Sequence, residues 1–114
     1  MSCTNTMRKV EALAQDEYFM AAEQHGEIFA SRHEGESVIR EEVEETGEGV
    51  DEINIRHQSM WRRIRRNVSA KSVSESVVDL YNAAVETAAE AVQVAAMAMK
   101  MMATLEQEGK DGKD

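Results

Sequence analysis

The chain has 114 residues, of which 42% are hydrophobic, and a formal net charge of −9 at pH 7. This length suits one domain, and the apolar content excludes a compositionally disordered chain. The acidic balance argues against a nucleic-acid partner, because the phosphates would be repelled. The single cysteine, Cys3, excludes a disulfide framework, and no apolar run approaches the roughly 20 residues that span a bilayer. We therefore expect a cytoplasmic protein without a membrane partner.

The composition also favours an all-α fold. There is no proline, glycine occurs only six times, and the apolar residues are mainly alanine, valine and methionine. Such residues support closely packed helices better than sheets. We expect a helical bundle of about four helices with a long C-terminal helix. Residues 1–6 would be a disordered N-terminus, residues 7–107 a single helical domain, and residues 108–114 a disordered polar tail.

The first expected helix covers residues 7–24, where apolar side chains recur at helical spacing. Gly26 would end this helix, because glycine readily takes the left-handed conformation of a helix cap. After a short connection, Ser31 and Glu34 would form a capping box at the start of the next helix. That second helix is expected over residues 33–46.

Two glycines follow, and a third helix is expected after them. Gly47 and Gly49 each lower helical stability by about 1 kcal/mol relative to alanine, so we expect a kink, a break or fraying there. The third helix would cover residues 51–67 and turns abruptly basic. Its cations could pair with acidic neighbours, or they could form a cationic lip that receives phosphate groups. The basic residues are Arg56, Arg62, Arg63, Arg65 and Arg66.

The last and longest helix is expected over residues 73–107, after a serine-rich turn, with Ser72 or Ser74 as its cap. It is apolar over most of its circumference, so a single chain would leave much of it uncovered and self-association is expected. Polar residues three or four apart form one narrow line along it. The line is either the solvated side of a bundle or one wall of a site. Its members are Asp79, Asn82, Glu86, Glu90 and Gln93.

An acidic stretch at residues 38–45 carries the candidate chemistry. Glu42 falls inside the apolar arc of this helix and Glu45 falls on its edge, whereas Glu44 and Glu48 point away. A buried carboxylate without compensation costs several kcal/mol, so a cation is expected to meet Glu42. The alternative is an acidic solvated face that extends around the helix. The arc is formed by Val38, Ile39, Val43, Val50 and Ile53.

Two helices thus each offer oxygen-bearing side chains one turn apart. Glu42 and Glu45 have this spacing on one helix, and Glu90 and Gln93 have it on the other. Facing helices could therefore place four such groups around one point. Carboxylate and amide oxygens suit Mg²⁺ or Mn²⁺ rather than zinc, and the Glu-x-x-His motif of di-iron bundles does not occur on either helix.

The two acidic blocks resemble a known family. Glu41-Glu42-x-x-Glu45, followed by Glu90-x-x-Gln93, is similar to the paired motifs EExxE and ExxD of the all-α nucleoside triphosphate pyrophosphohydrolases, the MazG-like superfamily. The resemblance covers about residues 22–106. The flanking sequences resemble a phage-associated branch of that superfamily: His33-Glu34-Gly35 before the first block, and Val-Ala-Ala-Met-Ala after the second.

The resemblance implies a homodimer or homotetramer that uses Mg²⁺, with Mn²⁺ as an alternative. It implies conversion of a nucleoside triphosphate to the monophosphate and pyrophosphate, a reaction of nucleotide-pool housekeeping. Glu41 and Glu42 would be the catalytic residues. The metal ligands would be Glu42, Glu45, Glu90 and Gln93. The candidates for substrate contacts are Glu86, Arg62, Arg63 and His33.

Gln93 departs from the family pattern, which usually has Asp at this position. An amide oxygen can bind Mg²⁺ but adds no charge, so the metal affinity should fall. This leaves a second hypothesis, a catalytically weak or inactive oligomeric binding or regulatory module of the same fold. A third hypothesis is a coiled-coil-like adaptor whose acidic stripes are both solvated. Convergence of Glu42 and Glu90 on a pocket with Glu45 would favour the first two hypotheses over the third.

Overall fold

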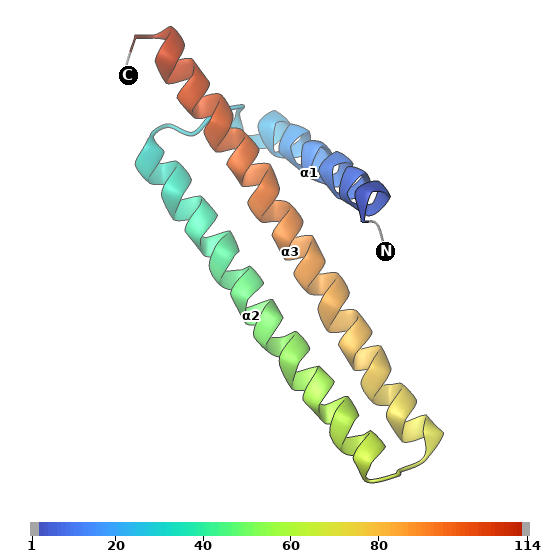
Figure 1. Cartoon of the computed structure of the whole chain (residues 1–114). Helices are drawn as coiled ribbons and strands as arrows, with labels where there is room; N and C mark the ends of the chain where they lie inside the picture. The colour runs from blue at the N-terminus through green and yellow to red at the C-terminus, as the bar shows by residue number, and fades with distance from the viewer. Residues whose placement is uncertain (1–2, 113–114) are drawn as a thin grey trace. The chain divides into compact units, whose positions relative to one another are not determined.

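The computed structural model describes residues 3–112, and all of their regular secondary structure is helical (Figure 1). The three helices are α1 (Thr4–His25), α2 (Arg32–Arg65) and α3 (Ala70–Lys110). The predicted all-α class is thereby confirmed. Within residues 3–112, none of the helices is long and apolar enough to cross a membrane.

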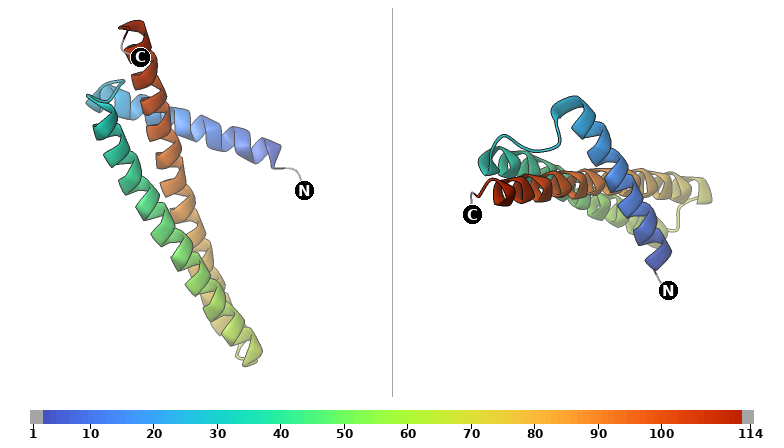
Figure 2. Two further views of the ribbon diagram at one scale, coloured as in Figure 1. Left: turned by 60° about the vertical axis from the view of Figure 1, so that its left-hand side comes forward. Right: turned by 90° about the horizontal axis from the view of Figure 1, so that it is seen from above.

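The helices contribute to two compact units. The three-helix unit comprises the described residues up to Val43 and from Ala91 onward, and so contains α1, the start of α2 and the end of α3. The hairpin unit, Glu44–Glu90, contains the remainder of α2 and α3 with the connection that joins them. In the hairpin unit the two helices lie side by side, as the views of Figures 1 and 2 agree.

The core of the three-helix unit is small and is centred on Phe29. In this unit α1 crosses the end of α3 at an angle (Figure 2). The Phe29 side chain is buried, and its backbone N–H donates to Thr104 Oγ1 at 2.9 Å. Thr104 Oγ1 donates in turn to the carbonyl oxygen of Lys100 at 2.7 Å. The connection between α1 and α2 is thus held against α3 by a buried hydrogen-bonded pair.

The ends of the first two helices follow the sequence signals. α1 ends at His25, and Gly26 has a φ of 92°, a conformation that disfavours side chains. At the start of α2, Ser31 Oγ accepts a hydrogen bond from the backbone N–H of Glu34 at 3.1 Å. The predicted stop at Gly26 and the predicted cap at Ser31 are confirmed.

The start of α3 differs from the prediction. The helix begins at Ala70, and Ser69 Oγ accepts the backbone N–H of Ser72 at 3.2 Å. The prediction that Ser72 or Ser74 caps this helix is therefore wrong. The chain turns earlier because Asn67 adopts a φ of 53°, which asparagine tolerates better than most residues.

The chain ends are more helical than expected. Residues 4–6 belong to α1 and residues 108–110 belong to α3, although we expected both segments to be disordered. The rest of the expected disordered segments includes residues 1–2 and 113–114, which lie outside the described part of the chain.

α2 continues as one helix through the two glycines. Of the predicted kink, break or fraying, the break is therefore wrong, and residues 3–112 form three helices instead of the expected four. A Cβ added at Gly49 would collide with Thr87 of α3, whereas a Cβ at Gly47 would meet nothing within 4 Å. Thr87 is buried, and its Oγ1 donates to the carbonyl oxygen of Ala83 at 2.7 Å. Gly49 is therefore retained for close approach of the two helices, not for interruption of α2.

Alanine substitutions at the two glycines should have opposite effects. Gly47→Ala should raise the free energy of unfolding by about 0.5–1 kcal/mol, through helix propensity alone. Gly49→Ala should lower it by about 1 kcal/mol or more, because the added methyl group overpacks the contact with Thr87. Urea unfolding followed by circular dichroism measures both. Equal stabilisation by the two substitutions would contradict the close packing at Gly49.

Candidate functional site

An acidic cavity of about 280 Å³ lies between α2 and α3 in the hairpin unit. Gly49, Ala83 and Thr87 line it with small side chains or none, so longer carboxylates from both helices can extend over it. All of its charged lining residues are acidic: Glu45, Glu48 and Glu52 from α2, and Glu86 and Glu90 from α3. This charge favours a cationic ligand.

Glu45 and Glu90 form the closest arrangement for a metal ion in this unit. Each offers one carboxylate oxygen, and the two oxygens lie within 4.8 Å of each other. Oxygen ligands on opposite sides of one Mg²⁺ or Ca²⁺ ion, at about 2.0–2.6 Å each, would be about 4–5 Å apart. Glu45 is exposed and Glu90 is half-buried, so an ion could enter from solvent. The donor set and its spacing therefore fit a hard divalent cation.

Glu42, in the three-helix unit, is another carboxylate of α2. It lies one helical turn before Glu45, which places both side chains on the same side of the helix. Glu42 is half-buried and also offers an oxygen that could serve a metal ion. This partial burial agrees with its predicted place inside the apolar arc.

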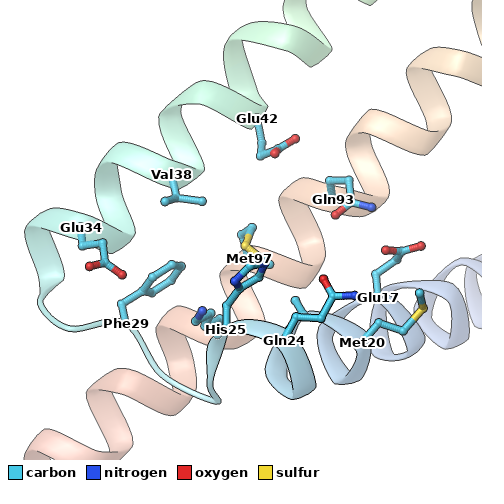
Figure 3. A pocket seen from close by; sticks show the side chains of 12 residues that line it. Glu17, Met20, Gln24, His25, Phe29, Glu34, Val38, Glu42, Gln93 and Met97 are labelled. Carbon is cyan, nitrogen blue, oxygen red and sulfur yellow. The ribbon is translucent and has the colours of Figure 1, made fainter.

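A cleft of about 560 Å³ occupies the three-helix unit. Figure 3 shows Glu17 from α1, Glu42 from α2 and Gln93 from α3 around it, with Met20 and Met97 among its apolar lining. The cleft therefore combines carboxylates, amides and apolar surface, which is the kind of lining that binds small organic ligands.

Lys100 is the one lysine or arginine that lines this cleft. Lys100 is buried, with only 6% of its surface exposed, and its Nζ lies 4.7 Å from the centroid of the Phe29 ring. A cation over an aromatic face is stabilised by the ring quadrupole. The sequence analysis missed Lys100, although it is the one basic residue between Lys71 and Lys110 in an otherwise apolar helix.

Two further predicted residues, Glu86 and Gln93, line different spaces. Glu86 lines the acidic cavity with Glu45 and Glu90. Gln93 lines the cleft of the three-helix unit together with Glu42. Glu48 also lines the acidic cavity, and it is exposed, as its predicted place away from the apolar arc implies. The helical wheel of α2 alone could not reveal which side faces α3.

Two other predicted residues lie outside both spaces. Glu41 is exposed and lines neither the cavity nor the cleft. His33 is exposed as well, and the cleft is lined instead by His25 and Glu34. The roles of Glu41 and His33 stay predictions.

Arg62 and Arg63 lie near the C-terminal end of α2, whereas the acidic cavity lies beside the middle of this helix. About 26 Å of helix separates Glu45 from Arg62, at a rise of about 1.5 Å per residue. Arg63 Nη1 donates to the carbonyl oxygen of Ser72 at 2.7 Å, across the connection to α3. Neither guanidinium can reach Glu45 or Glu90 in the acidic cavity of its own chain.

Two ion pairs near the start of α2 lie apart from these spaces. Arg32 pairs with Glu108 of α3 at 2.7 Å, and this hydrogen bond raises the pKa of Arg32. The Arg40 guanidinium hydrogen-bonds to Glu36 and lowers the pKa of that carboxyl group. Both pairs are solvent-exposed, so each contributes little to stability.

Comparison of the chain with protein-family models, with curated proteins and with solved structures yielded no match.

Charge removal at the cavity should weaken metal binding selectively. Glu45→Gln and Glu90→Gln should each lower the affinity for Mn²⁺ on the order of tenfold, because fewer charged ligands hold the ion. Glu44→Gln is the matched control, since Glu44 is exposed on the same helix and does not line the acidic cavity. Calorimetric titration or Mn²⁺ paramagnetic resonance measures the affinity. Equal loss in all three variants would indicate only a general charge effect.

Proposed function

We propose that the protein is a Mg²⁺-dependent nucleoside triphosphate pyrophosphohydrolase-like enzyme. The observation that carries this proposal is the pair Glu45 and Glu90, whose oxygens lie within 4.8 Å of each other in an acidic cavity. Glu42, one turn before Glu45, would complete the ligand set. The resemblance of both acidic blocks to the MazG-like superfamily points to the same reaction.

The chain would supply positioning and proton transfer. When bound, a divalent ion neutralises phosphate charge and lowers the pKa of an attacking water. Glu42, Glu45 and Glu90 would hold the ion. Glu86 and Glu48 line the same cavity, and either could accept a proton from the water as a general base. Glu41 stays a candidate for this role on the strength of the motif.

The cleft of the three-helix unit would receive the nucleoside. Gln24 and Gln93 offer both hydrogen-bond donors and acceptors, which can read the edge of a base, and methionines supply apolar surface. Lys100 would contact a phosphate, because its side chain is the one lysine or arginine that lines the cleft and its positive charge attracts an anionic group. Gln93 would then serve the nucleoside rather than the ion, which offers a reason for an amide at this position.

A second candidate function is a binding or regulatory module of the same fold without catalysis. The lack of charge at Gln93 favours this alternative, because the ligand set loses a carboxylate relative to the usual motif. The third hypothesis, a coiled-coil-like adaptor with independently solvated stripes, is less favoured. Glu45 and Glu90 line a common cavity instead of facing separate solvent.

We also propose a homodimer or a homotetramer. Large apolar side chains are exposed in both units, among them Phe19 at 60% in the three-helix unit and Tyr81 at 66% in the hairpin unit. A surface of this kind supports association.

Activity is tested by pyrophosphate release from a panel of ribo- and deoxyribonucleoside triphosphates with Mg²⁺ or Mn²⁺. We expect release that requires the metal and falls at least about a hundredfold in Glu42→Gln and in Glu90→Gln, because metal-assisted attack is lost. Glu44→Gln should retain the activity. A protein that folds and binds Mn²⁺ but releases no pyrophosphate from any triphosphate would leave the binding module as the better conclusion.

Lys100→Met tests the proposed phosphate contact. The substitution keeps a long side chain in the buried position but removes the charge. The KM for the triphosphate should rise about tenfold or more, since a charge-assisted contact is lost. Lys110→Met is the control, because Lys110 is exposed at the end of α3. An unchanged KM in Lys100→Met would exclude this role.

A further inference from the structure

The charges of the hairpin unit are strongly segregated along its length. Residues 44–52 carry only acidic charges, and the charged residues of 75–90 are also acidic. Residues 53–74, which include the connection between α2 and α3, carry only basic ones. One end of the hairpin is therefore the acidic end, at Glu45 and Glu90, and the other is a basic tip. The tip cations are Arg62, Arg63, Arg65, Arg66 and Lys71.

The tip cations have no carboxylate partner within residues 3–112. Arg56, the first cation of the basic segment, is paired with Glu52 at 2.6 Å and with Asp79 at 4.0 Å. Beyond it, Arg63 donates to a backbone carbonyl oxygen and Arg65 lies over the Trp61 ring. A cluster of like charges is unfavourable on a small unit unless an anionic partner approaches it.

The hairpin also exposes apolar side chains on both helices. Few of its residues are buried, and those that are buried are small: Ser76, Ala83 and Thr87. A two-helix unit of this kind cannot enclose its own apolar surface. The large exposed residues are Val50, Ile55, Trp61 and Ile64 on α2, and Val77, Val78, Tyr81 and Val85 on α3.

We propose that a second copy of the chain packs against the hairpin unit in antiparallel orientation, so that the basic tip of each copy lies at the acidic cavity of the other. The charges at the two ends of the unit favour this orientation, because the acidic end of one copy complements the basic tip of the other. Antiparallel pairing brings opposite charges together at both ends, whereas parallel pairing would place tip against tip and repel. The apolar side chains of both helices would be buried between the copies.

The lengths of the helices fit this arrangement. The hairpin part of α2 has its middle between Asn54 and Ile55, so pairing about this point sets Glu45 at the level of Ile64, which lies between Arg63 and Arg65, in the second copy. The hairpin part of α3 has its middle near Leu80, which sets Glu90 at the level of Ala70 and Lys71. Both ends therefore match in one twofold-symmetric dimer, which buries the same surface on each copy.

This arrangement would complete the candidate active site in trans. Within one chain the guanidinium of Arg62 is about 26 Å of helix away from Glu45, but in the dimer the tip of the second copy reaches the cavity. Its arginines would then bind the polyphosphate of a nucleotide, which arginine recognises through paired hydrogen bonds. This consequence rests on the proposed function, whereas the dimer itself does not.

The dimer is tested first, without nucleotide or metal, by sedimentation and by distances between spin labels. In a Cys3→Ser background, labels at Asn54→Cys, near the twofold axis, should be closer than labels at Val68→Cys, at the tip. Short distances for both label pairs would show parallel packing and overturn the proposal. A monomer at every accessible concentration would overturn it as well.

Charge variants test what drives the pairing. Combined Arg62→Gln, Arg65→Gln and Arg66→Gln should weaken dimerisation about tenfold or more, and added salt should weaken the unaltered protein. Combined Arg8→Gln, Lys9→Gln and Lys110→Gln changes the net charge equally outside the hairpin and should leave the dimer intact. Circular dichroism checks that each variant is folded. Equal dimerisation of both triple variants would refute the role of the tip.

Subunit mixing tests the contribution in trans. Chains are mixed at a concentration well above the dimer dissociation constant of the tip-arginine variant, so that both variants are dimeric and pair at random. Glu90→Gln homodimers and tip-arginine homodimers should each be nearly inactive, but mixed chains should regain roughly a quarter of the activity, because one site is complete in half of the dimers. No recovery, with heterodimers present, would show that the arginines do not act in trans. If the unaltered protein is itself inactive but forms the antiparallel dimer, the proposed function fails and the dimer stands.

Discussion

The close approach of α2 and α3 at Gly49 and Thr87 is the contact on which the candidate chemistry depends. Helices separated by larger side chains would hold their carboxylates too far apart to share one ion. Here a glycine faces a buried threonine, and Ala83 lines the same cavity. Glu45 and Glu90 extend past these small groups, and their oxygens come within 4.8 Å. Close backbone packing thus sets the spacing of the ligands.

The carboxylates of the cavity oppose the packing that brings them together. Two like charges about 4.8 Å apart repel by roughly 1 kcal/mol even in a medium as polar as water, and more when they are partly buried. Positions of α2 and α3 that face away from the other helix could have held these residues without this repulsion. Their placement between the helices is therefore understandable if a cation offsets it, and this physical argument does not depend on any family resemblance.

The sequence predicted the helical class, the stop at Gly26 and the cap at Ser31, because each depends on local backbone chemistry. It failed at Gly49, where helix propensity suggested a break. The deciding contact is with Thr87, distant in sequence, and no local rule contains it. The candidate site was likewise predicted only in part. Helical spacing grouped Glu42 with Glu45, but which residues join Glu90 depended on how α2 and α3 face each other.

The same limit explains why Lys100 and the tip arginines required the structure. From the sequence alone, Lys100 is only an isolated cation in a mainly apolar part of α3. The structure shows that it is buried beside Phe29 and lines a cleft. The arginines of residues 56–66 follow the acidic residues closely in sequence, which suggests that the two groups lie close together in space. Because α2 is unbroken, however, about 26 Å of helix separates Arg62 from Glu45. The continuity of this helix turns a sequence cluster into two opposite poles. These opposite poles and the uncovered apolar surface are the two features that favour the proposed antiparallel dimer, because a reversed second copy of the hairpin would complement both.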